Sequence, residues 1–280
     1  MALCQQKFLF LDLILILYII IHRKDVPKMK IAVITGASSG LGAEFAFETE
    51  KQRKDIEEIW LIARREDKLK ELADKINCKT RIVPLDITDL ECQKKYEKLL
   101  KEENADVRLL INNAGFGKLG NFDELTPEDN GGMVKLNCEA LTVMTSLTLP
   151  FMSEGSEIIN SCSIASFAPN TRMAVYCSTK AYVMSLSRAL RGELKSRKIN
   201  CLAACPGPMD TEFLGIAGIE KGSSHTFDTL PRVNPNTMAK KSLIASNRKK
   251  AVYTNRLFFK FYRLLAKILP HSLVMKMAAT

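Results

Sequence analysis

Tyr176 and Lys180 stand four residues apart, and on a helix this spacing puts both side chains on one face. A free tyrosine has a pKa of about 10, so it can act as an acid or base near neutral pH only where a nearby cation favours the phenolate. Lys180 is that cation by its spacing. The pair predicts proton transfer to or from a substrate oxygen, and the alternative is an ordinary surface pair on an amphipathic helix.

A hydroxyl that could hold this substrate oxygen precedes Tyr176 by thirteen residues. Residues 158–163, IINSCS, predict a buried strand that ends at Ser163. Ser163 is therefore a candidate donor to the oxygen. The alternative is a strand-end serine that bonds only to local backbone.

The sequence TGASSGLG at residues 35–42 predicts a turn that holds a pyrophosphate. It follows residues 31–34, which predict a buried strand, and precedes residues 44–47, which predict the start of a helix. Glycines there permit positive φ, close approach of backbone N–H groups to phosphate, and tight packing of the helix on the strand. The helix N-terminus adds oriented donors for the anion. Taken alone, the turn also fits an ordinary strand-to-helix connection.

Together these residues resemble the classical short-chain dehydrogenases/reductases. The resemblance runs from Lys30 to Thr211, and its motifs stand in the family's order, with NNAG at 112–115 and PGPMDT at 206–211. It implies a Rossmann-type fold, an enzyme, a nicotinamide cofactor and a homo-oligomer. The implied catalytic residues are Asn137, Ser163, Tyr176 and Lys180. The implied cofactor-binding residues are Gly36, Ser38, Ser39, Gly40, Leu41, Gly42, Arg64, Arg65, Asp86, Ile87, Asn113, Ala114, Gly115, Tyr176, Lys180, Pro206, Gly207 and Thr211.

The resemblance also implies a mechanism, which is hydride transfer between the nicotinamide and a carbonyl or secondary-alcohol carbon. Tyr176 moves the proton of the substrate oxygen, and Ser163 holds that oxygen. Lys180 lowers the pKa of Tyr176 and bonds the nicotinamide ribose, while Asn137 anchors a water that passes protons to bulk solvent. Such donors would already be in place where charge develops on the oxygen. The alternative for Asn137 is a purely local hydrogen bond.

The choice between NADP(H) and NAD(H) depends on residues 63–65, which end the second predicted strand. An acidic residue there would bind the ribose 2′-hydroxyl and repel a 2′-phosphate. This chain instead has Arg64 and Arg65, whose guanidinium groups favour the phosphate. We therefore expect NADP(H), with NAD(H) as the alternative, because Ser39 stands where many NADP-preferring members carry a basic residue. The alternative for the two arginines is that they are solvent-exposed residues at the start of a helix. Asp86 falls at the position where the family contacts adenine.

Seven apolar runs near 31–35, 58–63, 80–86, 107–112, 157–162, 199–205 and 251–254 alternate with amphipathic stretches of helical length. This pattern predicts an α/β fold, a single doubly wound parallel sheet of about seven strands with helices on both faces. With 280 residues and 46% hydrophobic content, the chain can form one sizeable core. We expect a catalytic domain over residues 29–255 and additions at both ends.

The eight cysteines form no CxxC pair, and the three histidines have no metal-ligand spacing with them. This pattern is typical of reduced cysteine in a cytoplasmic protein, so we expect no disulfide and no metal.

The N-terminal extension, residues 1–28, contains 14 almost unbroken apolar residues at 8–21, followed by His22, Arg23 and Lys24. A spanning helix needs about 20 residues, and no signal-peptide cleavage site follows. Two interpretations stay open. The segment is a membrane anchor with a cytosolic C-terminal side, or Met29 is the natural start and opens the protein on its first strand, which is the interpretation we favour.

Basic charge is concentrated near the C-terminus. The chain has a net charge of +10, yet residues 229–280 hold eleven Lys or Arg and no acidic residue. Over residues 256–280 the spacing predicts a basic amphipathic helix, with Leu257, Phe258, Phe261, Leu264, Leu265 and Ile268 on its apolar face. We expect this face to pack on the domain or a second subunit; the alternative is peripheral contact with an anionic membrane. No nucleic-acid motif is present.

In the family that this chain resembles, the segment over residues 207–233 covers the substrate. In this chain the segment carries an apolar stripe, which favours a steroid, bile acid or acyl-type substrate. We therefore expect a cytoplasmic, NADP(H)-dependent oxidoreductase that interconverts a ketone and a secondary alcohol on such a small molecule. One alternative is a membrane-attached reductase of lipid-borne carbonyls. Another is a regulator that senses NADP(H) without turnover, against which the intact Ser163, Tyr176 and Lys180 argue.

Overall fold

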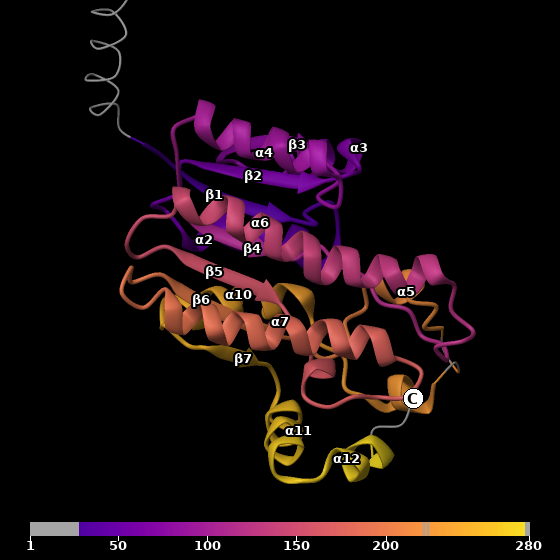
Figure 1. Ribbon diagram of the computed structural model, residues 1–280. Helices are drawn as coiled ribbons and strands as arrows, with labels where there is room; N and C mark the ends of the chain where they lie inside the picture. Colours follow the sequence, from indigo (N-terminus) through magenta and orange to yellow (C-terminus); the bar gives the residue numbers. More distant parts are fainter. Residues whose placement is uncertain (1–27, 221, 223, 278–280) are drawn as a thin grey trace, which may run out of the picture.

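The computed structural model describes residues 28–220, 222 and 224–277. Within these residues, one parallel sheet runs in the order β3-β2-β1-β4-β5-β6-β7 (Figure 1). The strands are β1 (Met29–Thr35), β2 (Glu58–Ala63), β3 (Lys79–Pro84), β4 (Ala105–Asn112), β5 (Glu157–Ser161), β6 (Asn200–Cys205) and β7 (Val252–Thr254). Each strand lies on one of the seven apolar runs. The expected doubly wound parallel α/β sheet is confirmed.

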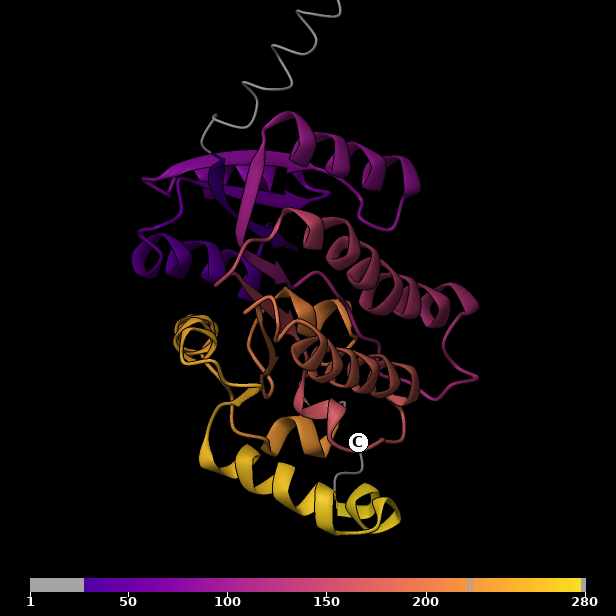
Figure 2. The same ribbon diagram turned by 60° about the vertical axis from the view of Figure 1, so that its left-hand side comes forward.

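Helices cover both faces of this sheet (Figures 1 and 2). Helices α2 and α10 pack together on one face with α3, while α4, α6 and α7 cover the other. The helices are α2 (Gly40–Gln52), α3 (Glu66–Ala73), α4 (Leu90–Glu102), α5 (Pro127–Val134), α6 (Leu141–Thr148), α7 (Ala174–Glu193), α8 (Glu212–Ile216), α9 (His225–Thr229), α10 (Pro235–Asn247), α11 (Leu257–Ile268) and α12 (His271–Met277). Short segments of other helix types are η1 (Lys135–Ala140), η2 (Leu149–Phe151) and η3 (Ile164–Ser166).

The five central strands β2, β1, β4, β5 and β6 are buried on both faces, which explains their largely apolar sequences, whereas the edge strands β3 and β7 are partly exposed. In β1, Ala32 and Ile34 join the core cluster under α2 and α10, whereas Ile31 and Val33 join the cluster under α4 and α6. Alternate side chains of a strand point to opposite faces of the sheet. The sheet is therefore a rigid platform whose strand ends can position a site.

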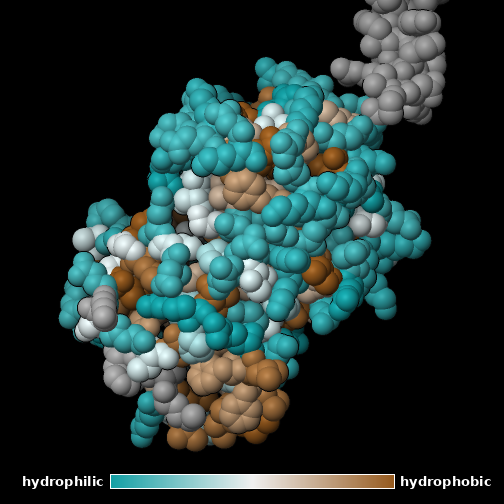
Figure 3. Space-filling model, turned by 180° about the vertical axis from the view of Figure 1, so that it is seen from behind, coloured by the Kyte–Doolittle hydropathy of each residue, from teal (hydrophilic) through white to brown (hydrophobic). Residues whose placement is uncertain are grey.

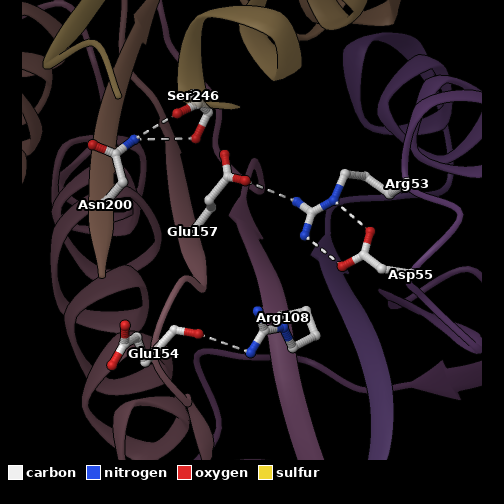
Figure 4. A network of polar contacts seen from close by, with 7 residues as sticks. All are labelled: Arg53, Asp55, Arg108, Glu154, Glu157, Asn200 and Ser246. Carbon is white, nitrogen blue, oxygen red and sulfur yellow. Dashed lines mark hydrogen bonds and ion pairs between the residues drawn. The ribbon is translucent and has the colours of Figure 1, made fainter. Parts of the chain in front are cut away.

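The strand order reverses at β1, which pairs with β2 on one side and β4 on the other. In open α/β sheets, ligands bind outside the carboxyl ends of the strands at such a reversal. The opposite, amino-terminal edge has a structural network instead (Figure 4). There Arg53 contacts Asp55 and Glu157, and Asn200 donates to the backbone and hydroxyl oxygens of Ser246.

The C-terminal segment differs from the expected single helix over residues 256–280. Helix α11 ends at Ile268 and α12 begins at His271. Pro270 lacks an N–H and disfavours a helical conformation in the preceding residue, so Leu269 is extended. Residues 1–27, which hold nearly all of the expected N-terminal extension, lie outside the described residues.

The apolar face expected to pack on the domain is largely exposed in this chain, so that part of the prediction is wrong. The exposed fractions are 81% for Leu257, 56% for Phe258, 59% for Phe261, 52% for Leu264 and 69% for Ile268. The helix is held instead by Phe259 and Ala266, which are buried. In the part of the chain that is described, no helix has the length and apolar character to cross a membrane.

Candidate active site

The predicted site residues meet around one cavity of about 930 Å³ at the carboxyl ends of the strands. The cavity extends from Asp86, beyond β3, to Phe261 on α11. All the residues predicted to bind cofactor or substrate line it, except Gly42 and Asn137, which lie behind its wall. The structure therefore brings together segments that are far apart in the sequence.

The Gly-rich turn between β1 and α2 cannot accommodate side chains at its closest contacts. A Cβ at Gly42 would overlap the Gly36 carbonyl oxygen, and a Cβ at Gly36, whose φ is +65°, would lie 2.8 Å from the Ala114 backbone. Ser39 is the N-cap residue of α2, but its hydroxyl makes no cap bond. The turn therefore presents backbone and a helix N-terminus to the cavity, as an anion site requires.

A chain of hydrogen bonds joins this turn to Lys180. The Asn113 amide donates to the Gly36 carbonyl oxygen at 3.3 Å, and the Ser161 hydroxyl donates to Asn113 at 3.0 Å. Lys180 Nζ then donates to the Ser161 carbonyl oxygen at 2.8 Å. Thr35 supports the same junction, because its hydroxyl accepts from the backbone N–H of Asn113. Ser161 and Thr35 were missed by the sequence analysis, since only the strand register shows that they are adjacent to the motifs.

The three groups predicted to carry the proton chemistry lie together. The Ser163 hydroxyl accepts from the Ala165 N–H at 3.1 Å at the start of η3, and it lies near enough to the Tyr176 phenol to lower the pKa of Tyr176. Lys180 Nζ lies 5.7 Å from the centre of the Tyr176 ring. All three side chains are buried in the chain, and Tyr176 and Lys180 come from adjacent turns of α7.

The expected lowering of the Tyr176 pKa is wrong for this chain on its own. Burial raises the pKa of Tyr176, and the nearby Ser163 hydroxyl offsets only part of that effect. Burial likewise lowers the pKa of Lys180. The reason is geometric, since the ammonium lies over the ring and bonds the Ser161 carbonyl rather than the phenol oxygen.

Asn137 lies in the π-helical turn η1 and is almost completely buried. Its amide group donates to the Phe116 carbonyl oxygen at 2.8 Å and to Thr179 at 3.1 Å, and its oxygen accepts from the Phe116 N–H at 3.0 Å. Single π-turns within helices often occur at functional sites. Asn137 thus fixes the loop after β4 against α7, close to Lys180.

Arg64 and Arg65 follow β2 and both line the cavity, as expected. Arg65 donates to the hydroxyls of Ser38 and Ser39 at 3.2 and 3.0 Å, so it closes over the Gly-rich turn. It also pairs with Glu212 of α8 at 2.7 Å. Glu212 is a site residue that the sequence analysis missed. At the next strand, Asp86 accepts from the N–H and hydroxyl of Thr88, and Asp86 and Ile87 line the same end of the cavity.

The far end of the cavity is apolar. Phe213 and Ile216 of α8 line it, and the Phe213 ring lies 5.7 Å from that of Tyr176. Phe258, Phe261 and Leu265 of α11 complete this end. The segment over 207–233 was expected to cover the substrate, but the contribution of α11 was missed.

Fold and site define a class of protein, an α/β oxidoreductase with a dinucleotide site beside a Ser–Tyr–Lys cluster. A family model described as short chain dehydrogenase matches residues 30–218, and the chain belongs to this family. It is an NAD(P)-dependent enzyme that acts on hydroxyl or carbonyl groups.

Individual relatives are consistent with this assignment. The NADP-dependent 3-hydroxy acid dehydrogenase of Schizosaccharomyces pombe is 31% identical over 233 residues, which cover 80% of this chain and 89% of the relative. A short-chain dehydrogenase from Sphingobium yanoikuyae, solved with NADPH, has a TM-score of 0.70 and 29% identity, and the match covers 81% of this chain and 88% of that one. The bulky-bulky ketone specific alcohol dehydrogenase from Comamonas testosteroni has a TM-score of 0.68 and 25% identity, over 85% and 91% of the two chains.

Proposed function

We propose that this enzyme interconverts a ketone and a secondary alcohol on an apolar substrate, that it prefers NADP(H) to NAD(H), and that Tyr176 is its general acid or base. The observation that carries the proposal is the placement of Ser163, Tyr176 and Lys180 together on the wall of the cavity, where its two halves meet. One half is lined by the Gly-rich turn and the arginines, and the other by apolar side chains.

The residues of the first half fit a nicotinamide dinucleotide. The turn before α2 has glycine at positions 36 and 42, where a side chain would collide with backbone atoms. Its backbone N–H groups are therefore accessible to a phosphate. Arg64 and Arg65 supply cations for a 2′-phosphate, and Asp86 and Ile87 would contact the adenine. When bound, the nicotinamide would supply or accept the hydride.

The protein's own residues would handle the oxygen and its proton. In the reductive direction Tyr176 gives its phenol proton to the carbonyl oxygen, which Ser163 holds in place. Burial raises the pKa of Tyr176 in the chain on its own, and the Lys180 ammonium, 5.7 Å from the centre of the ring, would offset part of that effect as the phenolate forms. Asn137 would anchor a water that passes protons from Lys180 to bulk solvent. In oxidation the same proton moves in the opposite direction.

The nature of the substrate is supported by the apolar half of the cavity. Phe213, Ile216 and Phe261 offer no partner for a strongly polar substrate. The relative from Comamonas testosteroni, described as specific for bulky ketones, supports the same class. A steroid, bile acid or acyl-type ketone would fit these walls.

A screen of ketones and alcohols with NADPH, NADH and their oxidised forms tests the proposal through absorbance at the nicotinamide band. We expect turnover of bulky apolar ketones with NADPH and slower turnover with NADH. Tight NADPH binding with no turnover of any substrate would instead indicate a cofactor-sensing protein and contradict the proposal.

A further inference from the structure

Helix α11 presents different chemistry on successive faces. Its outer apolar face consists of Leu257, Phe261, Leu264 and Ile268, which follow helical spacing and are each more than half exposed. Figure 3 shows the brown surface that α11 forms at the lower end of the molecule. A contiguous exposed apolar patch formed by four large side chains marks an interaction site.

The protein fixes the direction in which this face points. Phe259 is fully buried against Gly207, and Ala266 packs in a small cluster with Ala168 and Val274 of α12. The Tyr262 ring also lies 6.0 Å from that of Phe167. The outer apolar face therefore has to point away from the domain.

A row of cations lies directly beside the outer apolar face. Lys260, Arg263 and Lys267 follow steps of three and four; Lys260 and Lys267 are exposed, and Arg263 is half-buried. Within the described residues, no ion pair joins any of the three to an acidic group. Because residues 229–280 contain no Asp or Glu, this end of the molecule has strong positive charge.

The remaining side of α11 faces the substrate end of the cavity. Phe258 and Leu265 line the cavity, and Phe261 belongs both to the cavity wall and to the outer apolar face. Ile216 of α8 also lines the cavity while it is 51% exposed. The cavity mouth is thus continuous with the exposed apolar surface.

We propose that α11 lies on an anionic lipid surface, with the outer apolar face in the acyl boundary and the three cations at the headgroups. The helix has 12 residues, so it is far too short to span a bilayer and suits a position in the interface plane. Charge complementarity selects this partner. A symmetric contact between two copies of the outer apolar face would supply no acidic partner for either cation row, whereas anionic headgroups neutralise both.

Docking on lipid also narrows the substrate class, and this narrowing rests on the proposed function. A cavity that opens beside the lipid can receive a substrate directly from it, so the substrate class narrows to long-chain or polycyclic ketones and alcohols that partition into membranes. The outer apolar face would then serve both as anchor and as the edge of the substrate path.

A tryptophan reporter tests the docking without interference from other segments. The chain's only tryptophan, Trp60, is fully buried, so its emission should not respond to lipid. Leu264→Trp places a reporter on the outer apolar face, and Leu90→Trp places one on α4, where Leu90 is 62% exposed. The probes are phosphatidylglycerol–phosphatidylcholine vesicles and pure phosphatidylcholine vesicles, each with and without brominated acyl chains.

We expect the Leu264→Trp emission to shift to the blue and to be quenched by brominated chains in the anionic vesicles only. The shift should weaken with salt, because exposed charges are screened over about 10 Å at 0.1 M and about 3 Å at 1 M. The Leu90→Trp emission should not change. Equal responses of the two variants, or none from Leu264→Trp, would overturn the proposal, whatever residues 1–27 do with lipid.

Charge substitutions provide the second arm. The triple variant Lys260→Gln, Arg263→Gln, Lys267→Gln should weaken vesicle binding of the reporter about 100-fold, since each cation near the surface contributes about fivefold. The matched control removes three charges from α4 with Lys94→Gln, Lys98→Gln and Lys101→Gln, and should not change it. An equal effect of both triples would contradict a specific role of α11.

Two further measurements separate the remaining explanations. If Leu264→Glu dissociates a dimer in sedimentation velocity while the reporter ignores vesicles, the outer apolar face is an interface between copies and the proposal is wrong. With anionic vesicles present, Leu264→Glu should slow turnover of a long-chain ketone but not of a short water-soluble one. If neither ketone turns over, the proposed function fails, while the reporter still decides the docking.

Discussion

Arg65 and Glu212 form an ion pair of 2.7 Å that joins the end of β2 to α8 across the cofactor half of the cavity. Arg65 is 44% exposed and Glu212 is 50% exposed. The guanidinium lowers the pKa of Glu212, which keeps that carboxylate charged. An exposed pair of this kind contributes at most about 1 kcal/mol, whereas a charged hydrogen bond to phosphate contributes about 1.5 to 3 kcal/mol. A 2′-phosphate can therefore replace Glu212 as the partner of Arg65.

Arg65→Ala should weaken NADPH binding by about 1.5 to 3 kcal/mol and leave NADH binding nearly unchanged, because only NADPH has the 2′-phosphate. Glu212→Gln is the matched variant. It removes a negative charge that competes with the 2′-phosphate for Arg65, so NADPH should bind severalfold more tightly. The affinity for NADH should not change. Fluorescence titration of both cofactors measures the two effects. Equal losses for NADPH and NADH in Arg65→Ala would remove this arginine from the phosphate site.

Tyr176→Phe should lower turnover by roughly 100-fold to 10,000-fold, because it keeps the ring but removes the proton carrier. Cofactor affinity should change little. Tyr182→Phe is the control on the same helix; its hydroxyl bonds Thr142 at 2.8 Å on the surface. Steady-state kinetics on an accepted ketone decides the matter, and near-normal turnover in Tyr176→Phe would refute the mechanism.

The pH dependence follows from the direction of the Tyr176 shift. Burial raises the pKa of Tyr176, so the phenolate that accepts a proton during alcohol oxidation is scarce at neutral pH and increases as the pH rises. At low concentrations of alcohol and cofactor, kcat/KM for oxidation should increase with pH through the neutral range, while ketone reduction, which needs the phenol, should not. An oxidation rate that is already constant from acidic to alkaline pH would contradict this assignment.

Much of the fold could be predicted from sequence because the central strands are buried on both faces and are therefore largely apolar runs. β6, for example, is buried at every residue from Asn200 to Cys205. The glycines of the turn before α2 were predictable for a similar reason, since backbone geometry restricts the residue type there. Gly36 and Gly42 have no room for a Cβ.

Partners across long sequence separations could not be predicted. Glu212 meets Arg65 from 147 positions away, and no local pattern marks such a pair. The prediction that the apolar face of α11 packs on the domain was wrong for another reason. Amphipathic spacing shows that a helix has an apolar side, but which of its apolar residues contacts the protein depends on one complementary shape, here the space beside Gly207 that Phe259 fills.

Gly207→Ala should destabilise the protein by about 1 to 3 kcal/mol, because the added Cβ would overlap the buried Phe259 ring. Gly192→Ala on α7 is the control. Nothing lies within 4 Å of its added Cβ, so it should stabilise by about 0.5 to 1 kcal/mol. Urea unfolding measures both. In a Phe259→Ala background the cost of Gly207→Ala should vanish, and a persistent cost would mean that the clash lies elsewhere.

Arg53→Met should destabilise the chain by about 3 to 5 kcal/mol without changing kcat or KM. Arg53 is 12% exposed and pairs with Glu157, 5% exposed, so its loss leaves a buried carboxylate unpaired at the edge of the sheet opposite the site (Figure 4). The control, Lys101→Met, breaks the exposed pair with Glu97 and should cost less than about 1 kcal/mol. Thermal unfolding distinguishes the two, and equal small effects would show that the Glu157 charge is solvated.

The contact between Gly207 and Phe259 also has a consequence for how the enzyme is made. The Gly-rich turn, Tyr176 and the loop of Gly207 all leave the ribosome before Phe259 does. Domains fold as units, with earlier parts of the chain available first. A nascent chain that already contains Ser163, Tyr176 and Lys180 still lacks the ring that fills the space beside Gly207, so α11 completes a cavity whose polar residues were synthesised well before it.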